Sequence, residues 1–250
     1  MATALILGDI TGRSRVAVRM LTSVLEARGH EVLALPTALI SNTLNLPRHA
    51  TLDTTDYLLS SLMAWEAMGL TWDCVLIGYI TGLAQANALC AVADRARARG
   101  AWVLVDPILG DGGKMYNAVT PEQAEGMRLL AQHADIVTPN FTEARLLAGE
   151  AGDPASLLAA LCDGGKRSAL ITSAELEGGE TAIVGFDART GSRFCVPFER
   201  VPGRHFGTGD LFSAHLADGL LRGRTLEGAA REANDAVGRA IRGEGEKLPR

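Results

Sequence analysis

Residues 102–137 read WVLVDPILGDGGKMYNAVTPEQAEGMRLLAQHADIV, and the fold class can be predicted from this segment. It begins with one apolar run, Trp102–Val105, and ends with another, Ile136–Val137, and both are suited to strands. Between them, Thr120-Pro121-Glu122-Gln123 offers an N-cap, a proline at the first helical position and a capping-box partner. Strand, helix and strand in this order are typical of an α/β protein.

The same alternation of short apolar runs and amphipathic segments covers most of the chain. The strand candidates are Leu5–Leu7, Val32–Leu35, Cys74–Ile77, Trp102–Val105, Ile136–Val137 and Ala169–Ile171. The helix candidates are residues 15–28, 54–68, 83–99, 121–132 and 154–162. Near-continuous apolarity suits strands that are covered on both faces. The pattern therefore predicts a doubly wound α/β fold, with a mostly parallel sheet flanked by helices.

The pattern changes after Ser173. Two extended segments, Thr181–Phe186 and Ser192–Val196, are separated by a turn, which predicts a hairpin in the C-terminal third. Two helices are predicted near residues 208–222 and 225–242. Because the sequence contains no internal repeat and no linker, we expect a single domain over residues 1–250.

Composition and net charge argue against some classes of function. The chain has 250 residues, enough for a full core, and its net charge of −5 argues against a nucleic-acid partner. No apolar stretch approaches the ~18 residues that span a bilayer, and the N-terminal residues lack a signal-peptide pattern. The four cysteines have no metal-binding spacing, so we expect buried thiols in a reducing compartment. These features predict a cytoplasmic protein without membrane or nucleic-acid partners.

Gly207-Thr208-Gly209-Asp210 stands directly before the apolar, helix-periodic run that starts at Leu211. A helix N-terminus carries unpaired amides and partial positive charge, which suits a phosphate. A carboxylate beside that phosphate makes chemical sense if Asp210 removes a proton from a hydroxyl that attacks phosphorus. This is the logic of a small-molecule kinase. The alternative is that Asp210 is only a first-turn acid and the glycines only form a tight turn.

Two further polar clusters follow predicted strands, where open α/β sheets place their sites. The loop Asp106–Gly113 carries two acids that could hold hydrated magnesium between nucleotide phosphates, although it is equally a solvated turn. In the second cluster, Asn140 and Glu143 are three residues apart at a helix start. This pair could act on magnesium, its waters or a monovalent ion. It could also be an N-cap with its capping glutamate.

Together these motifs resemble those of the pyridoxal/pyridoxamine kinases of the ribokinase-like superfamily, over nearly the whole chain. The matching stretches are Leu35–Ala38, Ile77–Tyr79, Val105–Asp111, Ala134–Asn140, Glu143, Arg200–Gly203 and Gly207–Asp210. The resemblance implies a ribokinase-like fold and ATP-dependent phosphorylation of the 5′-hydroxymethyl group of pyridoxal, pyridoxamine or pyridoxine. It also implies ATP and Mg2+ as cofactors, a monovalent cation such as K+, and a homodimer.

The resemblance also implies roles for individual residues. Asp210 matches the base and substrate contact, and Gly207, Thr208 and Gly209 match the anion hole. Positions that match the family's ATP and metal-ion contacts are Asp106, Asp111, Tyr116, Thr138, Asn140, Glu143, Thr172 and Ser173. Of these, Asp106, Asp111 and Glu143 are the expected metal contacts. Asp9 and Tyr79 match residues near the pyridine ring of the vitamer.

The chain departs from the family on the substrate side. Thr11-Gly12-Arg13-Ser14 stands where a glycine–aromatic run such as S-G-F-G is common, and Thr43-Leu44-Asn45 replaces an H-T-G segment. We expect these residues to line the vitamer pocket. The C-terminal segment, which ends in Glu244–Lys247 and three further residues, also stops earlier than is usual in the family.

Two alternatives to a pyridoxal kinase stay open. The first is a hydroxymethylpyrimidine kinase, although those enzymes usually carry G-T-G-C, so that Asp210 favours the pyridoxal side. The second is a degenerate vitamer-binding or regulatory homologue. The complete set Gly207–Asp210 argues against that second alternative.

Overall fold

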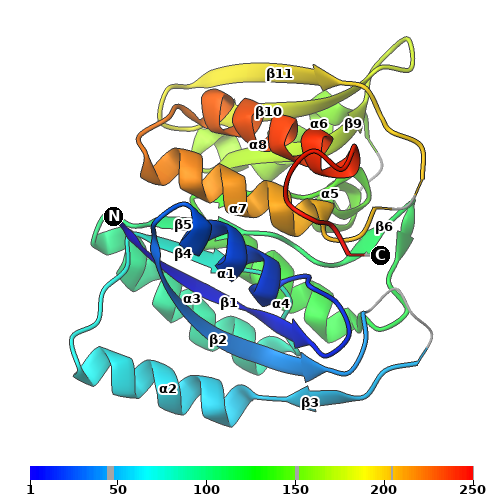
Figure 1. Cartoon of the computed structure of the whole chain (residues 1–250). Helices are drawn as coiled ribbons and strands as arrows, with labels where there is room; N and C mark the ends of the chain where they lie inside the picture. Colours follow the sequence, from blue (N-terminus) through cyan, green and yellow to red (C-terminus); the bar gives the residue numbers. More distant parts are fainter. Residues whose placement is uncertain (44–47, 150–151, 204, 250) are drawn as a thin grey trace.

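The computed structural model describes residues 1–43, 48–149, 152–203 and 205–249, and its centre is a nine-stranded sheet (Figure 1). The strand order is β11-β10-β9-β8-β5-β4-β1-β2-β3. The strands are β1 (Thr3–Thr11), β2 (Glu31–Ile40), β3 (Thr51–Asp53), β4 (Cys74–Ile77), β5 (Trp102–Val105), β8 (Ile136–Val137), β9 (Ser168–Glu175), β10 (Thr181–Asp187) and β11 (Ser192–Phe198). A separate two-stranded ribbon, β6 (Gly110–Asp111) with β7 (Lys114–Met115), follows β5.

The middle of the sheet is parallel, as predicted. β2, β1, β4, β5, β8 and β9 pair in parallel, whereas β3, β10 and β11 join antiparallel at the two edges. The predicted hairpin is β10–β11, with Asp187 opposite Ser192 at its turn. Because the middle strands are parallel, their carboxyl ends meet at one edge of the sheet, where α/β proteins place their sites.

Helices cover both faces of the sheet. They are α1 (Val18–Ala27), α2 (Thr55–Ala67), α3 (Leu83–Ala98), α4 (Pro121–Gln132), α5 (Phe141–Ala148), α6 (Pro154–Leu161), α7 (Thr208–Leu221) and α8 (Leu226–Ile241). Alternate residues of one strand point to opposite faces, so Leu5 and Leu7 pack with α2–α6 while Ala4 and Ile6 pack with α1, α7 and α8. The doubly wound arrangement is therefore confirmed (Figure 1).

Several local predictions are corrected by the structure. α1 begins at Val18 rather than at residue 15, because Ala17 has a φ of 48° and cannot belong to the helix. The edge strand β3 and the β6–β7 ribbon are too short and too exposed to show a periodic pattern in the sequence. Cys195 is exposed on the outer edge strand, whereas the other cysteines are buried as predicted. In the part of the chain described, no helix is long and apolar enough to cross a bilayer.

Candidate active site

A cavity of about 1270 Å³ lies at the edge where the parallel strands end. It brings together the residues that match the family's catalytic, anion-hole, ATP, metal and ring contacts. These are Asp9, Tyr79, Asp106, Asp111, Tyr116, Thr138, Asn140, Glu143, Thr172, Ser173, Gly207, Thr208, Gly209 and Asp210. They come from the ends of β1, β4, β5, β8 and β9, from the β6–β7 ribbon, and from the starts of α5 and α7, which lie far apart in the sequence but meet at this edge.

The N-terminus of α7 faces this cavity. Gly207 is the N-cap, and the first helical hydrogen bond runs from the Leu211 N–H to the Gly207 carbonyl oxygen. Among the residues that the structure describes, no side chain caps the helix, so the amides of its first turn are left for a ligand. Glycine is required at position 207 by its φ of 77°. An added Cβ there would also lie only 3.4 Å from Val16 Cγ1.

Three carboxyl groups converge beside this helix end. Burial, and then the charge of Asp210, raise the pKa of Asp9 to about 7 and that of Asp106 to about 7. Burial also raises the pKa of Asp210, and a hydrogen bond from the Ala17 backbone opposes this rise. Asp106 Oδ2 accepts a hydrogen bond of 2.9 Å from the Ser213 hydroxyl. This concentration of acid favours a cationic or metal-bound ligand.

The raised pKa values predict how stability depends on pH. Between 3.8, the ordinary value, and about 7, the folded chain binds protons at Asp9 and Asp106 that the unfolded chain does not. The free energy of unfolding therefore falls as the pH rises through this window. We expect the ligand-free protein to melt several degrees higher at about pH 5.5 than at about pH 7.5, because each of the two groups contributes up to about 2 kcal/mol over this interval.

Asp106→Asn removes one of the two titrating groups and is expected to flatten this pH dependence. Thermal unfolding of both proteins, followed by circular dichroism across the window, makes the comparison. A melting temperature that rises with pH in the unmodified protein contradicts the assignment.

Asn140 and Glu143 fix the loop that joins β5 to the β6–β7 ribbon. They form a complete capping box at the start of α5, which confirms the N-cap alternative. The Asn140 amide donates to the Gly110 carbonyl oxygen at 2.8 Å, and Glu143 Oε1 accepts from the Leu109 N–H at 3.0 Å. Glu143 Oε2 accepts from the Asn140 N–H at 3.0 Å. Because backbone amides bond both of its carboxylate oxygens, Glu143 holds this loop, and it also lines the cavity.

The β6–β7 ribbon forms another wall of the cavity. Asp111 and Lys114 are exposed and line it, and Tyr116, which follows the ribbon, also lines it. Burial, and then the charge of Glu143, raise the pKa of Tyr116. At Gly110 a Cβ would collide with the Lys114 backbone, so that only glycine allows the ribbon to close.

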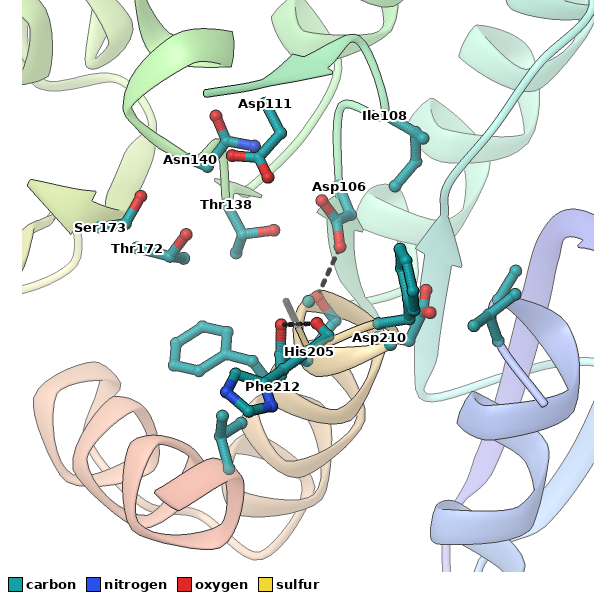
Figure 2. A pocket seen from close by; sticks show the side chains of 18 of the residues that line it. Asp106, Ile108, Asp111, Thr138, Asn140, Thr172, Ser173, His205, Asp210 and Phe212 are labelled. Carbon is teal, nitrogen blue, oxygen red and sulfur yellow. Dashed lines mark hydrogen bonds between the residues drawn. The ribbon is translucent and has the colours of Figure 1, made fainter. Parts of the chain in front are cut away.

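The hydroxyl of Thr138 is a candidate ligand-binding group. Its side chain is 4% exposed, and its Oγ1 has no hydrogen-bond partner among the described residues. A buried hydroxyl without a partner is costly unless a ligand satisfies it. Figure 2 shows Thr138 beside Thr172 and Ser173 on the wall opposite Asp210. These hydroxyls and the α7 amides together suit a polyphosphate.

The wall around Tyr79 is more apolar. Tyr79 packs with Ala38, Ile40 and Ile108, and its hydroxyl accepts a 2.7 Å hydrogen bond from the Gln123 side chain. This surface, with Asp9 close by, could take a flat ring that carries polar substituents.

The expectation for the substrate-side loops is corrected. Thr11 and Thr43 line the cavity, whereas Arg13, which is exposed, and Ser14, which is half-buried, are not among its lining residues. Leu44 and Asn45 lie outside the described residues.

Sequence reasoning missed Ser213, Ala17 and Gln123. Ser213 could have been found, because it lies three residues after Asp210 and therefore on the same face of α7. Ala17 acts on the site through the Asp210 carboxylate, and no local motif marks it. Gln123 acts through the Tyr79 hydroxyl, and the capping box in which the sequence places Gln123 does not point to the site.

The residues fit a magnesium ion that is shared with phosphates. Within the described ranges, no group of three or more His, Cys, Asp or Glu side chains could hold a metal by itself. Mg2+ commonly binds one or two carboxylates and takes its other ligands from substrate phosphates and water. Asp106 and Asp111 line the cavity beside the Thr138 hydroxyl and could supply those carboxylates.

Comparison with known proteins places these features in context. The sequence model of the phosphomethylpyrimidine kinase family matches residues 25–248. The chain is 33% identical over 246 residues to the pyridoxine/pyridoxal/pyridoxamine kinase of Bordetella avium, covering 87% of this chain and 77% of the relative. The crystal structure of pyridoxal kinase from Lactobacillus plantarum has a TM-score of 0.84 and 29% identity, covering 97% of this chain and 88% of that one. Pyridoxal kinase from Leishmania donovani, in complex with ADP and pyridoxamine, has a TM-score of 0.83 and 25% identity, covering 97% of this chain and 87% of that one.

Proposed function

This chain belongs to the phosphomethylpyrimidine kinase family, alongside the pyridoxal kinases of the ribokinase-like superfamily, and we propose that it phosphorylates a B6 vitamer. ATP donates the phosphoryl group, and the 5′-hydroxymethyl group of pyridoxal, pyridoxamine or pyridoxine accepts it. The observation that carries this proposal is the position of Asp210 at the N-terminus of α7. In the same cavity, the apolar wall around Tyr79 lies beside it, and the wall with the Thr138 and Thr172 hydroxyls lies opposite.

Asp210 is the general base in this proposal. Its carboxylate takes the proton of the hydroxymethyl group as the oxygen attacks the terminal phosphorus of ATP. Its raised pKa makes it a better proton acceptor than an exposed aspartate. The Ala17 N–H and the neighbouring acids set its orientation and charge.

The amides of Gly207, Thr208 and Gly209 form the anion hole. They line the cavity and would donate to the charge that develops on the transferred phosphoryl group. Asp106 and Asp111 would hold Mg2+, which neutralises phosphate charge when bound. Thr138, Thr172 and Ser173 line the wall that takes the ATP phosphates, with Tyr116 and the loop held by Asn140 and Glu143 next to it.

Thr138→Val tests the ATP side. The substitution keeps the shape of the side chain but removes a buried hydroxyl that has no partner in the ligand-free protein. We expect unchanged or slightly higher thermal stability, because a lone buried polar group is removed. We expect the KM for ATP to rise by about ten- to a hundredfold, since a hydrogen bond to a charged group is worth about 1.5–3 kcal/mol.

Thr138→Ser keeps the hydroxyl and is the matched control, with a KM for ATP close to that of the unmodified protein. Steady-state kinetics at fixed vitamer concentration and thermal unfolding give the two readouts. If valine leaves the KM for ATP unchanged, Thr138 does not contact the nucleotide.

Phosphorylation of a hydroxymethylpyrimidine is the alternative that the family match favours. Asp210 argues for the pyridoxal side, because hydroxymethylpyrimidine kinases usually carry cysteine there. The value of kcat/KM for pyridoxal, pyridoxamine, pyridoxine and hydroxymethylpyrimidine, each with saturating ATP, decides between them. We expect the highest value with a B6 vitamer. A higher value with the pyrimidine reverses the assignment, and no turnover with any of them favours a regulatory homologue.

Other properties are proposed from family membership alone. They are a single kinase domain over residues 1–250, a homodimer, a cytoplasmic location and stimulation by a monovalent cation such as K+.

A further inference from the structure

The chain turns back on itself after α8. The Gly243 N–H bonds the Ala240 carbonyl oxygen, and the Glu244 N–H bonds the Arg239 carbonyl oxygen at 2.9 Å. With a φ of 78° at Gly243, these two bonds form a Schellman motif, which redirects the chain. The following segment, Gly243–Pro249, is called the strap here, and Figure 1 shows it in red, folding back beside α7.

Glu246 fastens the strap to α7 and α1. Its Oε1 lies 3.1 Å from His215 Nε2 on α7 and 3.6 Å from the Arg28 guanidinium at the end of α1. Arg28 also lies 3.5 Å from His215 Nδ1, and a guanidinium only donates, so Nδ1 accepts and Nε2 carries the proton given to Glu246. The His215 side chain is 5% exposed, so this contact is largely shielded from water.

The end of the strap reaches the anion hole. Leu248 packs into the core cluster formed by α1, α7 and α8. Pro249 Cδ lies 3.3 Å from the position that a Cβ on Gly207 would occupy, next to Val16 and Met20. The residue that caps α7 is therefore enclosed by the strap on one side and by α1 on the other.

We propose that the strap positions the anion hole, with Glu246 and Pro249 as positioning residues that act through His215 and Gly207. The inference rests on the proposed kinase function, because it assigns a purpose to the first turn of α7. Gly207 has left-handed backbone geometry, and its N-cap conformation is held by packing rather than by a side-chain cap. Loosening the strap leaves the amides of Thr208 and Gly209 less well aimed at the transferred phosphoryl group.

The test compares Glu246→Ala with the unmodified protein. We expect kcat per folded molecule to fall by about tenfold with an unchanged KM for the vitamer, the signature of an interaction that is made only in the transition state. We also expect faster hydrogen exchange at the amides of residues 205–210. Glu246→Gln keeps an acceptor for His215 Nε2 and is expected to restore both readouts to near the original values.

A matched control separates positioning from stability. Leu221→Ala removes a partly buried side chain at the far end of α7 and is expected to lower the melting temperature without changing either readout. If Glu246→Ala leaves both kcat and exchange at residues 205–210 unchanged, the strap has no positioning role. If the unmodified protein turns over no hydroxymethyl substrate, the proposed function fails, and the exchange comparison alone then decides the strap.

Discussion

Asp210→Asn is expected to lower kcat by about 10²–10⁴-fold, the contribution that a positioned general base makes to a proton-transfer step. Asparagine keeps the size and hydrogen-bonding capacity of the side chain but cannot accept the hydroxymethyl proton. ATP binding is expected to persist, because the phosphate wall lies across the cavity, around Thr138 and Thr172. Steady-state turnover, with ATP binding measured by calorimetry, gives both readouts.

Asp210→Glu is the control that keeps the negative charge but changes the position of the carboxylate. It keeps a carboxylate but moves it by one methylene, and we expect it to recover only part of the lost turnover. The melting temperature of Asp210→Asn is expected to equal or exceed that of the unmodified protein, because a buried charge is removed. Turnover by Asp210→Asn above about a tenth of the original value contradicts the assigned role.

Removal of divalent cations is expected to lower turnover by about 10³-fold or more, because metal neutralisation of phosphate charge supplies several kcal/mol. The physical reason lies in the charges around the cavity. The charge of Asp210 already raises the pKa values of Asp9 and Asp106, so polyphosphate alone would add like charge to an acidic site. Chelation followed by titration with Mg2+ measures the requirement.

Asp111→Ala is expected to raise the Mg2+ concentration needed for half-maximal turnover while leaving stability unchanged, because Asp111 is exposed. Glu143→Ala is expected to differ. It removes the acceptor for the Leu109 and Gly110 amides, so it lowers the melting temperature as well as turnover. Undiminished turnover after thorough chelation would rule out the metal requirement.

The sequence predicts the fold well where burial imposes a pattern. Strands such as Cys74–Ile77 and Trp102–Val105 are covered on both faces, and their unbroken apolar runs reveal them. The parts that escaped prediction lack that signal. β3 is exposed at all its positions, and the β6–β7 ribbon is held by the Asn140 amide and the Thr142 hydroxyl rather than by a periodic pattern.

The residues of the candidate site could likewise be predicted only in part. Residues at strand ends and helix starts, such as Asp106 and Asp210, could be predicted because the fold brings those positions together. Arg13 and Ser14 are not among the lining residues as expected, because no periodic pattern or strand end fixes the course of a loop. The contact of Pro249 with Gly207 could not be predicted from the sequence either, since the two residues are remote in sequence and no motif links them.

The most direct test of the central claim is the fate of the terminal phosphate of ATP. The purified chain is incubated with terminally labelled ATP, Mg2+ and pyridoxal, and the labelled products are separated. We predict one labelled pyridoxal 5′-phosphate for each ADP formed, and none when Asp210→Asn replaces the unmodified protein. ADP formed with label only in free phosphate, or labelled pyridoxal 5′-phosphate formed equally well by Asp210→Asn, would contradict phosphoryl transfer by this site.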